Sequence, residues 1–409
     1  MRSLVTVVVG ALVGLSSVAC DVPTFGGRGP VPPTAVPTAP PTAQPVIQVV
    51  ASPTAAPVVR SSPDRPSDVI TRVYREGSPA VVSVLSTVVT GGFFNQAQPQ
   101  PSGAGSGFVI SDEGFIVTNN HVVEDADRLE VTLSNGRTVP AKLIGRDPRS
   151  DLAVVKVDVP KEQLSVARLG SSAQLEVGEP AIAIGNPFGL DRTVTAGIIS
   201  GRRPVLDEPA GGANGRATEP GLLIDAIQTD ASINPGNSGG PLFNARGEVI
   251  GINTLILSPG SQGGQGGNIG IGFAIPIDYA RRIVPELMSK GKYSHPFLGL
   301  GTQEITETIA QQASLPVKEG LLVAEVDASG PAAKAGIRAG TRPQDARSRQ
   351  VSLGGDIVVA VDGQPMRRPE ELLVYLEIQK RVGDPLTLNL LRDGQRREVT
   401  VQLADRPAR

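Results

Sequence analysis

The sequence has few of the residues that several function classes need. It contains no tryptophan, aromatic residues make up 3% of its 409 residues, and its formal net charge is −2. A chain without stacking surfaces or a positive excess is poorly suited to nucleic acid, so nucleic acid is not an expected partner. Its two histidines, His121 and His295, and its one cysteine, Cys20, lie far apart in the sequence. They do not provide a common zinc site, so we expect neither a metal nor another cofactor. A single cysteine also excludes an internal disulfide.

Cys20 stands at the end of an apolar N-terminal segment. Residues 4–19 form a stretch that is short for a membrane span and typical of a signal peptide. The small residues before Cys20 resemble a bacterial lipoprotein cleavage site, and lipidation of Cys20 would hold the chain at a membrane. Ser17 stands where leucine is usual, which leaves ordinary cleavage near Ala19 or an uncleaved anchor as alternatives. We assign residues 1–20 to a signal peptide with a lipobox-like end.

The length of 409 residues predicts two or three domains, and the 36 prolines and 48 glycines are too many for one compact fold. Proline alternates with Thr, Ala and Val through residues 21–66, in repeats such as P-T-A-P-P-T-A. Such a segment buries no core and favours extended polyproline II structure. We therefore expect residues 21–66 to be a disordered or semi-rigid linker.

The chain beyond the linker reads as mostly β. Many short apolar runs, separated by Gly, Pro and Asn, follow each other between residues 80 and 275. Asn135-Gly136, between two of these runs, is a strong hairpin signal. Short strands at this spacing favour barrels or a sandwich. Ile277–Ser289 is expected to form a closing amphipathic helix, whereas Gly91–Gly105, Arg202–Pro220 and Ser258–Asn268 are expected to be loops.

The segment from Gln228 to Pro241 has a pattern suited to nucleophilic catalysis. Its core is Asn237-Ser238-Gly239-Gly240. Glycines on both sides of a serine permit unusual backbone torsions and a close approach of substrate. The N–H groups of Gly236 and Ser238 could then converge as an oxyanion hole. A plain Gly/Asn/Ser turn between strands is the alternative reading of this segment alone.

Two other positions strengthen the catalytic interpretation. His121 follows the strand-like run F-I-V-T-N-N, and Asp151 directly precedes the run L-A-V-V-K-V. The order His121, Asp151, Ser238 is that of chymotrypsin-type enzymes and differs from the orders in subtilisin and the α/β-hydrolases. Each residue alone could be a cap, a turn or a surface residue. The three segments together favour a hydrolytic site.

At this point the chain resembles the HtrA/DegP-type serine endopeptidases. Seven stretches in order carry the resemblance, among them G-S-G-F-V-I, I-V-T-N-N-H-V-V, D-P-R-S-D-L-A-V-V-K, the segment around Ser238, and G-F-A-I-P. The resemblance implies a trypsin-like double β-barrel over residues 67–290 and an α+β PDZ domain over residues 296–403. It implies ATP-independent cleavage of unfolded or misfolded proteins in the cell envelope, as part of protein quality control, usually by a homotrimer. It implies His121 as base, Asp151 as orienting residue and Ser238 as nucleophile, with Gly236 and Ser238 as oxyanion donors and Asn237 shaping their loop.

In trypsin-like proteases the residue six before the nucleophile forms the floor of the primary pocket. That residue is Ser232 here, with Ile233 beside it, and neither can select lysine or arginine. We therefore expect cleavage after small or medium aliphatic residues. Gly251, Ile252, Asn253 and Thr254 are expected to form an edge strand that pairs with an extended substrate.

The PDZ resemblance implies a second binding site. Phe297-Leu298-Gly299-Leu300 would be the loop that captures a terminal carboxylate, and the strand after it would add a hydrophobic C-terminal peptide by β-augmentation. Leu372, Leu373 and Leu376 lie on one face of an expected helix, where they line the groove or pack in the core. The connection Thr341–Leu353 is longer and more polar than is usual in the family.

Three hypotheses follow from these observations. The first is a membrane-tethered serine endopeptidase regulated by peptide binding to its PDZ domain. The second is a holdase with a dormant protease fold, and the third is an envelope scaffold that acts through the PDZ groove alone. The intact serine, histidine and aspartate positions and the intact glycines favour the first.

Overall fold

The computed structural model describes residues 66–90, 98–186, 192–207, 222–234, 236–256, 270–346 and 349–407. The expected signal peptide, Cys20, almost all of the linker, residues 91–97 of the Gly91–Gly105 segment, residues 208–220 of the Arg202–Pro220 segment and the whole of Ser258–Asn268 lie outside these residues. Within the described residues, no helix is both long and apolar enough to cross a membrane.

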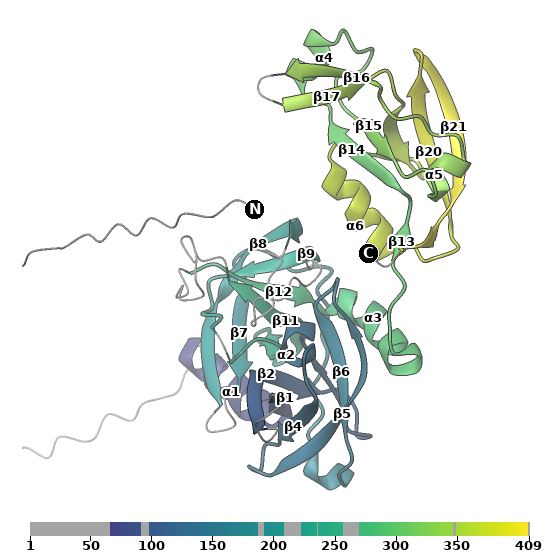
Figure 1. The fold of residues 1–409 in the computed structure, drawn as a ribbon. Coiled ribbons are helices and arrows are strands. Elements are labelled where there is room, and N and C mark those ends of the chain that lie inside the picture. The colour runs from purple at the N-terminus through teal and green to yellow at the C-terminus, as the bar shows by residue number, and fades with distance from the viewer. Residues whose placement is uncertain are drawn as a thin grey trace, which may run out of the picture. The chain divides into compact units, whose positions relative to one another are not determined.

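The N-terminal barrel of Figure 1 begins after the helix α1 (Pro66–Gly77) and a short 3-10 turn. Its strands are β1 (Val81–Thr90), β2 (Gln98–Val109), β3 (Phe115–Thr118), β4 (Arg128–Thr132), β5 (Thr138–Asp147) and β6 (Leu152–Val157). They close in the order β1-β2-β3-β6-β5-β4, and the short helix α2 (Asn120–Val123) follows β3. The predicted Asn135-Gly136 turn joins β4 and β5, with Gly136 at φ +81°.

A second closed barrel follows, in the order β10-β11-β12-β9-β8-β7 (Figure 1). Its strands are β7 (Pro180–Gly185), β8 (Thr193–Asp207), β9 (Leu222–Thr229), β10 (Pro241–Phe243), β11 (Val249–Ile256) and β12 (Gly272–Pro276). Phe108, Val117 and Leu152 of the first barrel share one buried core with Ile224, Ile252 and Phe273 of the second. Burial of this apolar surface fixes the two barrels against each other, so that loops from both can build one site.

The helix α3 (Ile277–Lys290) ends the two-barrel region. Ile283 and Leu287 are fully buried against the shared core, which accounts for the predicted amphipathic pattern. The helix ends at Gly291, whose φ of +75° allows its N–H to bond the carbonyl of Leu287.

The C-terminal part is an antiparallel sheet with helices. The sheet order is β14 (Leu300–Glu304), β15 (Leu321–Val326), β18 (Ile357–Val361), β20 (Pro385–Arg392) and β21 (Gln395–Gln402), with β19 (Gln364–Pro365) paired to β18. The strands β13 (Pro296–Phe297) and β22 (Ala404–Asp405) pair with each other, so the C-terminal part ends beside the residues where it begins. The helices are α4 (Glu307–Gln312), α5 (Pro331–Lys334) and α6 (Pro369–Gln379). Leu372 and Leu376 of α6 pack into the core of this part.

Three segments expected to be loops or connections contain strands instead. Residues 98–105 belong to β2, which pairs with β1 as far as Thr90 opposite Gln98. Residues 202–207 belong to β8, which pairs with β9 as far as Asp207 opposite Leu222. The polar connection near Thr341–Leu353 forms the hairpin of β16 (Arg342–Ala346) and β17 (Arg349–Leu353). Polar and glycine-rich composition hid these strands because each is defined by its pairing with a partner strand.

Candidate active site

The carboxylate of Asp151 lies buried between the two barrels. It stands in the turn between β5 and β6, is 2% exposed, and has a φ of +53°, a conformation that aspartate and asparagine tolerate better than most residues. Its two oxygens lie 3.0 and 2.9 Å from His121 Nδ1, and one accepts the backbone N–H of His121 at 3.0 Å. The hydroxyl of Thr254 donates to Oδ2 at 2.6 Å. Donors from three directions therefore fix the orientation of this carboxylate.

Two asparagines lock the His121 segment to the Asp151 turn. The Asn119 side chain donates to the carbonyl of Asp151 at 2.9 Å, and the backbone N–H of Asn120 donates to the same carbonyl at 3.1 Å. The first turn of α2 thereby holds the imidazole beside the carboxylate, with the side chain of His121 still 42% exposed. When Nδ1 donates to Asp151, Nε2 is the proton-accepting nitrogen of the ring.

Glu124 adds negative charge close to the imidazole. Burial and the charge of Asp125 raise the pKa of Glu124, whereas His121 and Arg146 act to lower it. Its carboxylate accepts a hydrogen bond from the Asn120 side chain at 3.2 Å. Glu124 is thus joined through Asn120 to the segment that carries His121.

Ser238 lies in the turn before β10 and is connected to the same network through Thr254. Its hydroxyl donates to the carbonyl of Thr254 at 3.3 Å, while the hydroxyl of that threonine donates to Asp151. The backbone of the turn is held by Gly239 N–H to Asn253 O at 2.8 Å and by Asn253 N–H to Gly240 O at 2.9 Å. One residue of β11 thus contacts both Ser238 and Asp151.

The backbone around Ser238 needs its glycines. Gly236 has a φ of +106° and Gly239 a φ of +81°, and a Cβ on Gly239 would lie 2.3 Å from the carbonyl of Ser106. Within the described residues, no group accepts a hydrogen bond from the N–H of Gly236 or of Ser238, whereas the N–H of Asn237 donates to Asn234 O at 3.1 Å. The Asn237 side chain also bonds the carbonyl of Ser232 and the N–H of Asn234. Two amide donors therefore remain available on either side of an anchored asparagine.

Ser106, which the sequence analysis did not single out, ties this turn to the first barrel. Its buried hydroxyl donates to Gly236 O at 2.5 Å and accepts from Asn186 N–H at 2.8 Å. Its backbone N–H donates to Ser238 O at 2.8 Å. The glycines on both sides of it were visible in the sequence, but these long-range contacts were not.

Replacing Ser106 by alanine is expected to lower kcat about tenfold and to destabilise the protein by about 1–3 kcal/mol, because the carbonyl of Gly236 and the amide of Asn186 lose their buried partner. Steady-state hydrolysis of a quenched peptide and thermal unfolding measure the two effects. Ser102→Ala, in the same strand but with a single hydroxyl contact to Ser86, is the matched control and is expected to change kcat less than twofold. Equal kinetics for both variants would contradict the positioning role of Ser106.

The predicted substrate-pocket residues occupy different environments. Ser232 is exposed, and its carbonyl accepts from Thr195 Oγ1 at 2.9 Å. Ile233 is 1% exposed, and Ile252 and Asn253 are fully buried, so their side chains present no open surface to a substrate. The Asn253 side chain instead donates to Pro241 O.

The prediction of an edge strand over Gly251–Thr254 is wrong for Gly251 and Ile252, which pair with β10 on one side and β12 on the other. Asn253 bonds Gly239 and Gly240 on the first side. Closure of the barrel removes the edge at these two residues. Thr254, expected in the pocket, contacts Asp151 and Ser238 instead.

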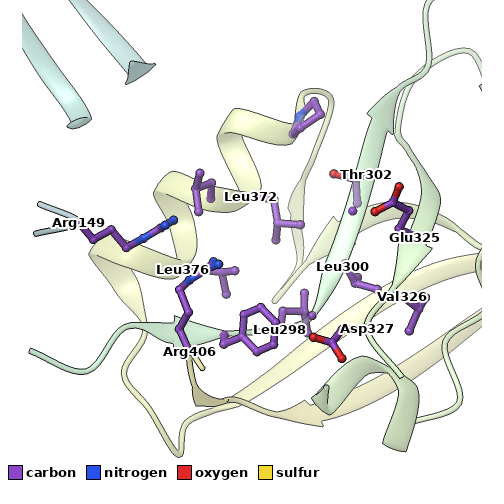
Figure 2. A pocket seen from close by; sticks show the side chains of 15 residues that line it. Arg149, Leu298, Leu300, Thr302, Glu325, Val326, Asp327, Leu372, Leu376 and Arg406 are labelled. Atoms are coloured by element: carbon purple, nitrogen blue, oxygen red, sulfur yellow. The ribbon is translucent and has the colours of Figure 1, made fainter. Parts of the chain in front are cut away.

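The six residues expected to line the peptide groove surround one hollow of about 550 Å³ (Figure 2). They are Phe297, Leu298, Gly299 and Leu300 of the loop and Leu372 and Leu376 of α6. The hollow lies between β14 and α6, and the two leucines of α6 serve both the groove and the core. Arg149, Thr302, Glu325, Asp327 and Arg406 are among the other residues that line it.

The described residues contain no group of three or more His, Cys, Asp or Glu side chains that could hold a metal ion. The candidate site consists of the residues described above, a serine hydroxyl, an imidazole, a buried carboxylate and two amide donors.

The fold and these residues define a trypsin-like peptidase domain combined with a PDZ domain. The family model for the trypsin-like peptidase domain matches residues 105–252, and that for the PDZ domain matches residues 296–403. The putative serine protease HhoA of Synechocystis sp. is 42% identical over 365 residues, covering 83% of this chain and 84% of the relative. The chain belongs to the HtrA/DegP family of serine endopeptidases.

Other relatives extend this comparison. A probable periplasmic serine endoprotease, DegP-like, of Brucella suis is 41% identical over 308 residues, which are 75% of this chain and 54% of the relative. The chain thus spans about half the length of that relative. Among solved structures, the HtrA-type protease AlgW with a tripeptide is 34% identical with a TM-score of 0.64, covering 83% of this chain and 98% of the other. The serine endoprotease from Yersinia pestis is 31% identical with a TM-score of 0.57, with the same coverage.

Proposed function

We propose that the protein is an ATP-independent serine endopeptidase in which Ser238 is the nucleophile, His121 the general base and Asp151 the residue that orients the imidazole. The observation that supports this most is the connected set of contacts in which Asp151 holds His121 Nδ1 and Thr254 bridges Asp151 to Ser238. A serine hydroxyl is a weak nucleophile until an adjacent base takes its proton, and this arrangement supplies the base in a fixed tautomer.

The proposed reaction has two halves. Ser238 Oγ attacks the carbonyl carbon of the scissile bond while its proton passes to His121 Nε2, and the N–H groups of Gly236 and Ser238 stabilise the charge on the carbonyl oxygen. His121 then gives the proton to the leaving amine, and an acyl-enzyme remains. A water molecule, deprotonated by His121, attacks the ester and releases the second product.

The proposed substrates are unfolded or misfolded polypeptides cleaved after small or medium aliphatic residues. Ser232 offers no carboxylate to a basic side chain, and the nearby Asp230 is engaged, because its Oδ1 accepts the N–H of Ile198 at 2.7 Å. Extended chains fit because strand addition uses main-chain hydrogen bonds, and β10 pairs with β11 only as far as Ile252.

The proposed peptidase is regulated by peptides, exported to the cell envelope and trimeric. Hydrophobic C-termini bind the groove beside α6 and shift the protein toward its active arrangement. The relatives named periplasmic and the N-terminal sequence support an exported protein of the cell envelope, held by a lipid on Cys20. A homotrimer with a protease domain at 67–290 and a PDZ domain at 296–403 completes the assignment.

Digestion of casein with mapping of the cleavage sites tests this function. The wild type is expected to cut mainly after Ala, Val, Ile or Leu and to react with a serine-directed fluorophosphonate at pH 7, and Ser238→Ala is expected to do neither. Predominant cuts after Lys or Arg would contradict the pocket assignment. Folded wild type that is never labelled, with or without a hydrophobic peptide, would instead indicate a binding module, and unchanged cellular function of Ser238→Ala would indicate a scaffold.

A further inference from the structure

The peptide groove has two cationic side chains near one end, and neither comes from the loop expected to receive a carboxylate. The loop Phe297–Leu300 contains no basic residue. Arg149 and Arg406 both line the groove, and Figure 2 shows them beside Leu376, away from Glu325 and Thr302. The guanidinium of Arg406 lies 5.0 Å from the centre of the Phe297 ring. Asp327, which also lines the groove, accepts two hydrogen bonds from Ser329.

Arg149 belongs to the turn that carries Asp151. Its backbone N–H donates to Asp147 Oδ1 at 3.3 Å, and its carbonyl accepts from Leu222 N–H at 2.7 Å. Its side chain, 22% exposed, extends from this turn to α6, the helix that supplies leucines to the groove. A residue two positions before Asp151 is therefore also a wall of the peptide site.

Arg149 belongs to an ionic cluster with Asp147, His295 and Glu377. His295 Nε2 lies 3.0 Å from both oxygens of Asp147, and His295 Nδ1 lies 2.9 Å from Glu377 Oε2. Burial alone would lower the pKa of His295, but its hydrogen bonds to Asp147 and Glu377 outweigh burial and raise the pKa to about 9. Two cations therefore balance two carboxylates at neutral pH.

The contact between Arg149 and Glu377 is the loosest in this cluster. Arg149 Nε lies 3.5 Å from Glu377 Oε1, and neither atom makes a hydrogen bond to any described residue although both are buried. The other oxygen of Glu377 contacts His295 and accepts the hydroxyl of Tyr279 at 3.2 Å. Glu377 therefore keeps its contacts with His295 and Tyr279 when Arg149 moves away. Arg149 also lines the groove, so its guanidinium can contact a ligand bound there.

We propose that the terminal carboxylate of a peptide bound in the groove pairs with Arg149, with Arg406 beside it, and so competes with Glu377 for this guanidinium. A guanidinium can donate two parallel hydrogen bonds to a carboxylate. Arg149 and Arg406 are the basic residues among those that line the described groove, so the negative charge of a peptide C-terminus is matched at this end. The inference rests on the proposed regulation of the peptidase by this groove and assigns the residue that carries it.

The hydrogen bonds of Arg149 connect the groove to the turn that carries Asp151. Movement of Arg149 toward a ligand pulls on the backbone that Asp147 and Leu222 hold, and Asp151 lies two residues further along the same turn. Because binding free energies are linked in both directions, any effect of the peptide on the Asp151 turn implies an equal effect of that turn on peptide affinity.

The first experiment measures binding in the full chain carrying Ser238→Ala, which leaves the probe intact. Fluorescence anisotropy compares a labelled hydrophobic peptide that ends in leucine with a free carboxylate against the same peptide with a C-terminal amide. Arg149→Gln is expected to weaken the acid about tenfold and the amide less than twofold, in line with the strength of a charge-assisted hydrogen bond. Arg149→Lys, which keeps the charge, is expected to keep part of the preference for the acid.

Arg338→Gln is the matched control. Arg338 is an exposed arginine of the same domain, paired with Asp393 at 3.9 Å and absent from the groove lining. It is expected to leave both affinities unchanged. If Arg149→Gln weakens acid and amide equally, or leaves both unchanged while the protein melts normally, the carboxylate contact is wrong.

The second experiment tests the coupling in chains with Ser238 intact. At saturating acid peptide, Arg406→Gln is expected to reach the same fold-stimulation of quenched-substrate hydrolysis as the wild type, because Arg406 lies outside the Asp151 turn. Arg149→Gln is expected to lose at least half of that stimulation. The coupling is wrong if the peptide stimulates Arg149→Gln as much as the wild type. It is also wrong if the wild type hydrolyses the substrate but is not stimulated by the peptide. A wild type without any hydrolysis rejects the proposed function instead, and the binding experiment still decides the contact.

Discussion

Replacing Asp151 by asparagine is expected to lower kcat for peptide hydrolysis about 10⁴-fold, with little effect on the fold. The amide is the same size and tolerates the left-handed backbone at this position, where φ is +53°. With the amide oxygen in the place of Oδ1, it can still accept from the N–H of His121, while the amide nitrogen takes the place of Oδ2 and the Thr254 hydroxyl turns to accept from it. The amide nitrogen, turned toward His121 Nδ1, donates a hydrogen bond where the carboxylate accepted one, so the proton of the ring moves to Nε2. His121 then has no acceptor for the Ser238 proton.

Pre-steady-state and steady-state hydrolysis of a quenched peptide measure this loss. The fluorophosphonate rate is expected to fall with kcat, because both need an activated Ser238. Asp158→Asn is the matched control, since that carboxylate is exposed and pairs with Lys142 on the surface; it is expected to change kcat less than twofold. If Asp151→Asn retains more than about a tenth of wild-type kcat, Asp151 does not set the tautomer of His121.

His295 is expected to make the stability of the protein fall as the pH rises from 6.5 through 9. Its ordinary pKa of 6.5 applies to the unfolded chain, and the folded environment raises it to about 9. The stabilisation from the protonated ring is therefore complete below pH 6.5 and is lost above pH 9, and it amounts to about 3 kcal/mol. The groups that face the ring are Asp147 from β5 and Glu377 from α6, with the ring of Tyr293 packed edge-on at 4.8 Å. Arg149 and Tyr279 contact Glu377 from its other sides.

Thermal unfolding at pH 6 and pH 10 measures this contribution. The decrease of Tm between the two values is expected to be clearly smaller in His295→Gln than in the wild type, because the neutral amide has no proton to lose. His121→Gln removes the other histidine of the chain and is expected to keep most of the decrease. Identical decreases in the wild type and His295→Gln would show that His295 is not protonated in the folded protein.

The fold was predictable because its signals are local. Short apolar runs, the Asn135-Gly136 turn and the amphipathic segment from Ile277 each occupy a few neighbouring residues, and all appear in the structure as expected. The resemblance to HtrA/DegP proteins was equally local, since it rests on seven short stretches. Strands in polar segments escaped prediction because only a partner far along the chain defines them. Residues 202–207 illustrate this, as they pair with β9 across the segment between residues 207 and 222.

The site was predictable only in part, for the same reason. The chemistry of His121, Asp151 and Ser238 was visible in residue types and order, and these residues remain the proposed catalytic groups. The contacts that position them were not visible, because Thr254 reaches Asp151 across 103 residues and Ser106 reaches Gly236 across 130. Charge balance around His295 depends on residues from two domains, so the sequence alone assigned that histidine no role.

The ionic cluster joins Glu377 of α6 to residues that precede the PDZ domain, and this affects how the affinity for peptides should be measured. A fragment that begins at Pro296 contains Glu377 but loses His295, Asp147 and Arg149. In such a fragment a carboxylate that is fully buried in the whole chain loses its two cations and faces water. Titrations on an excised PDZ module would then describe a site with altered electrostatics, and screening of peptide ligands is better done with the intact polypeptide.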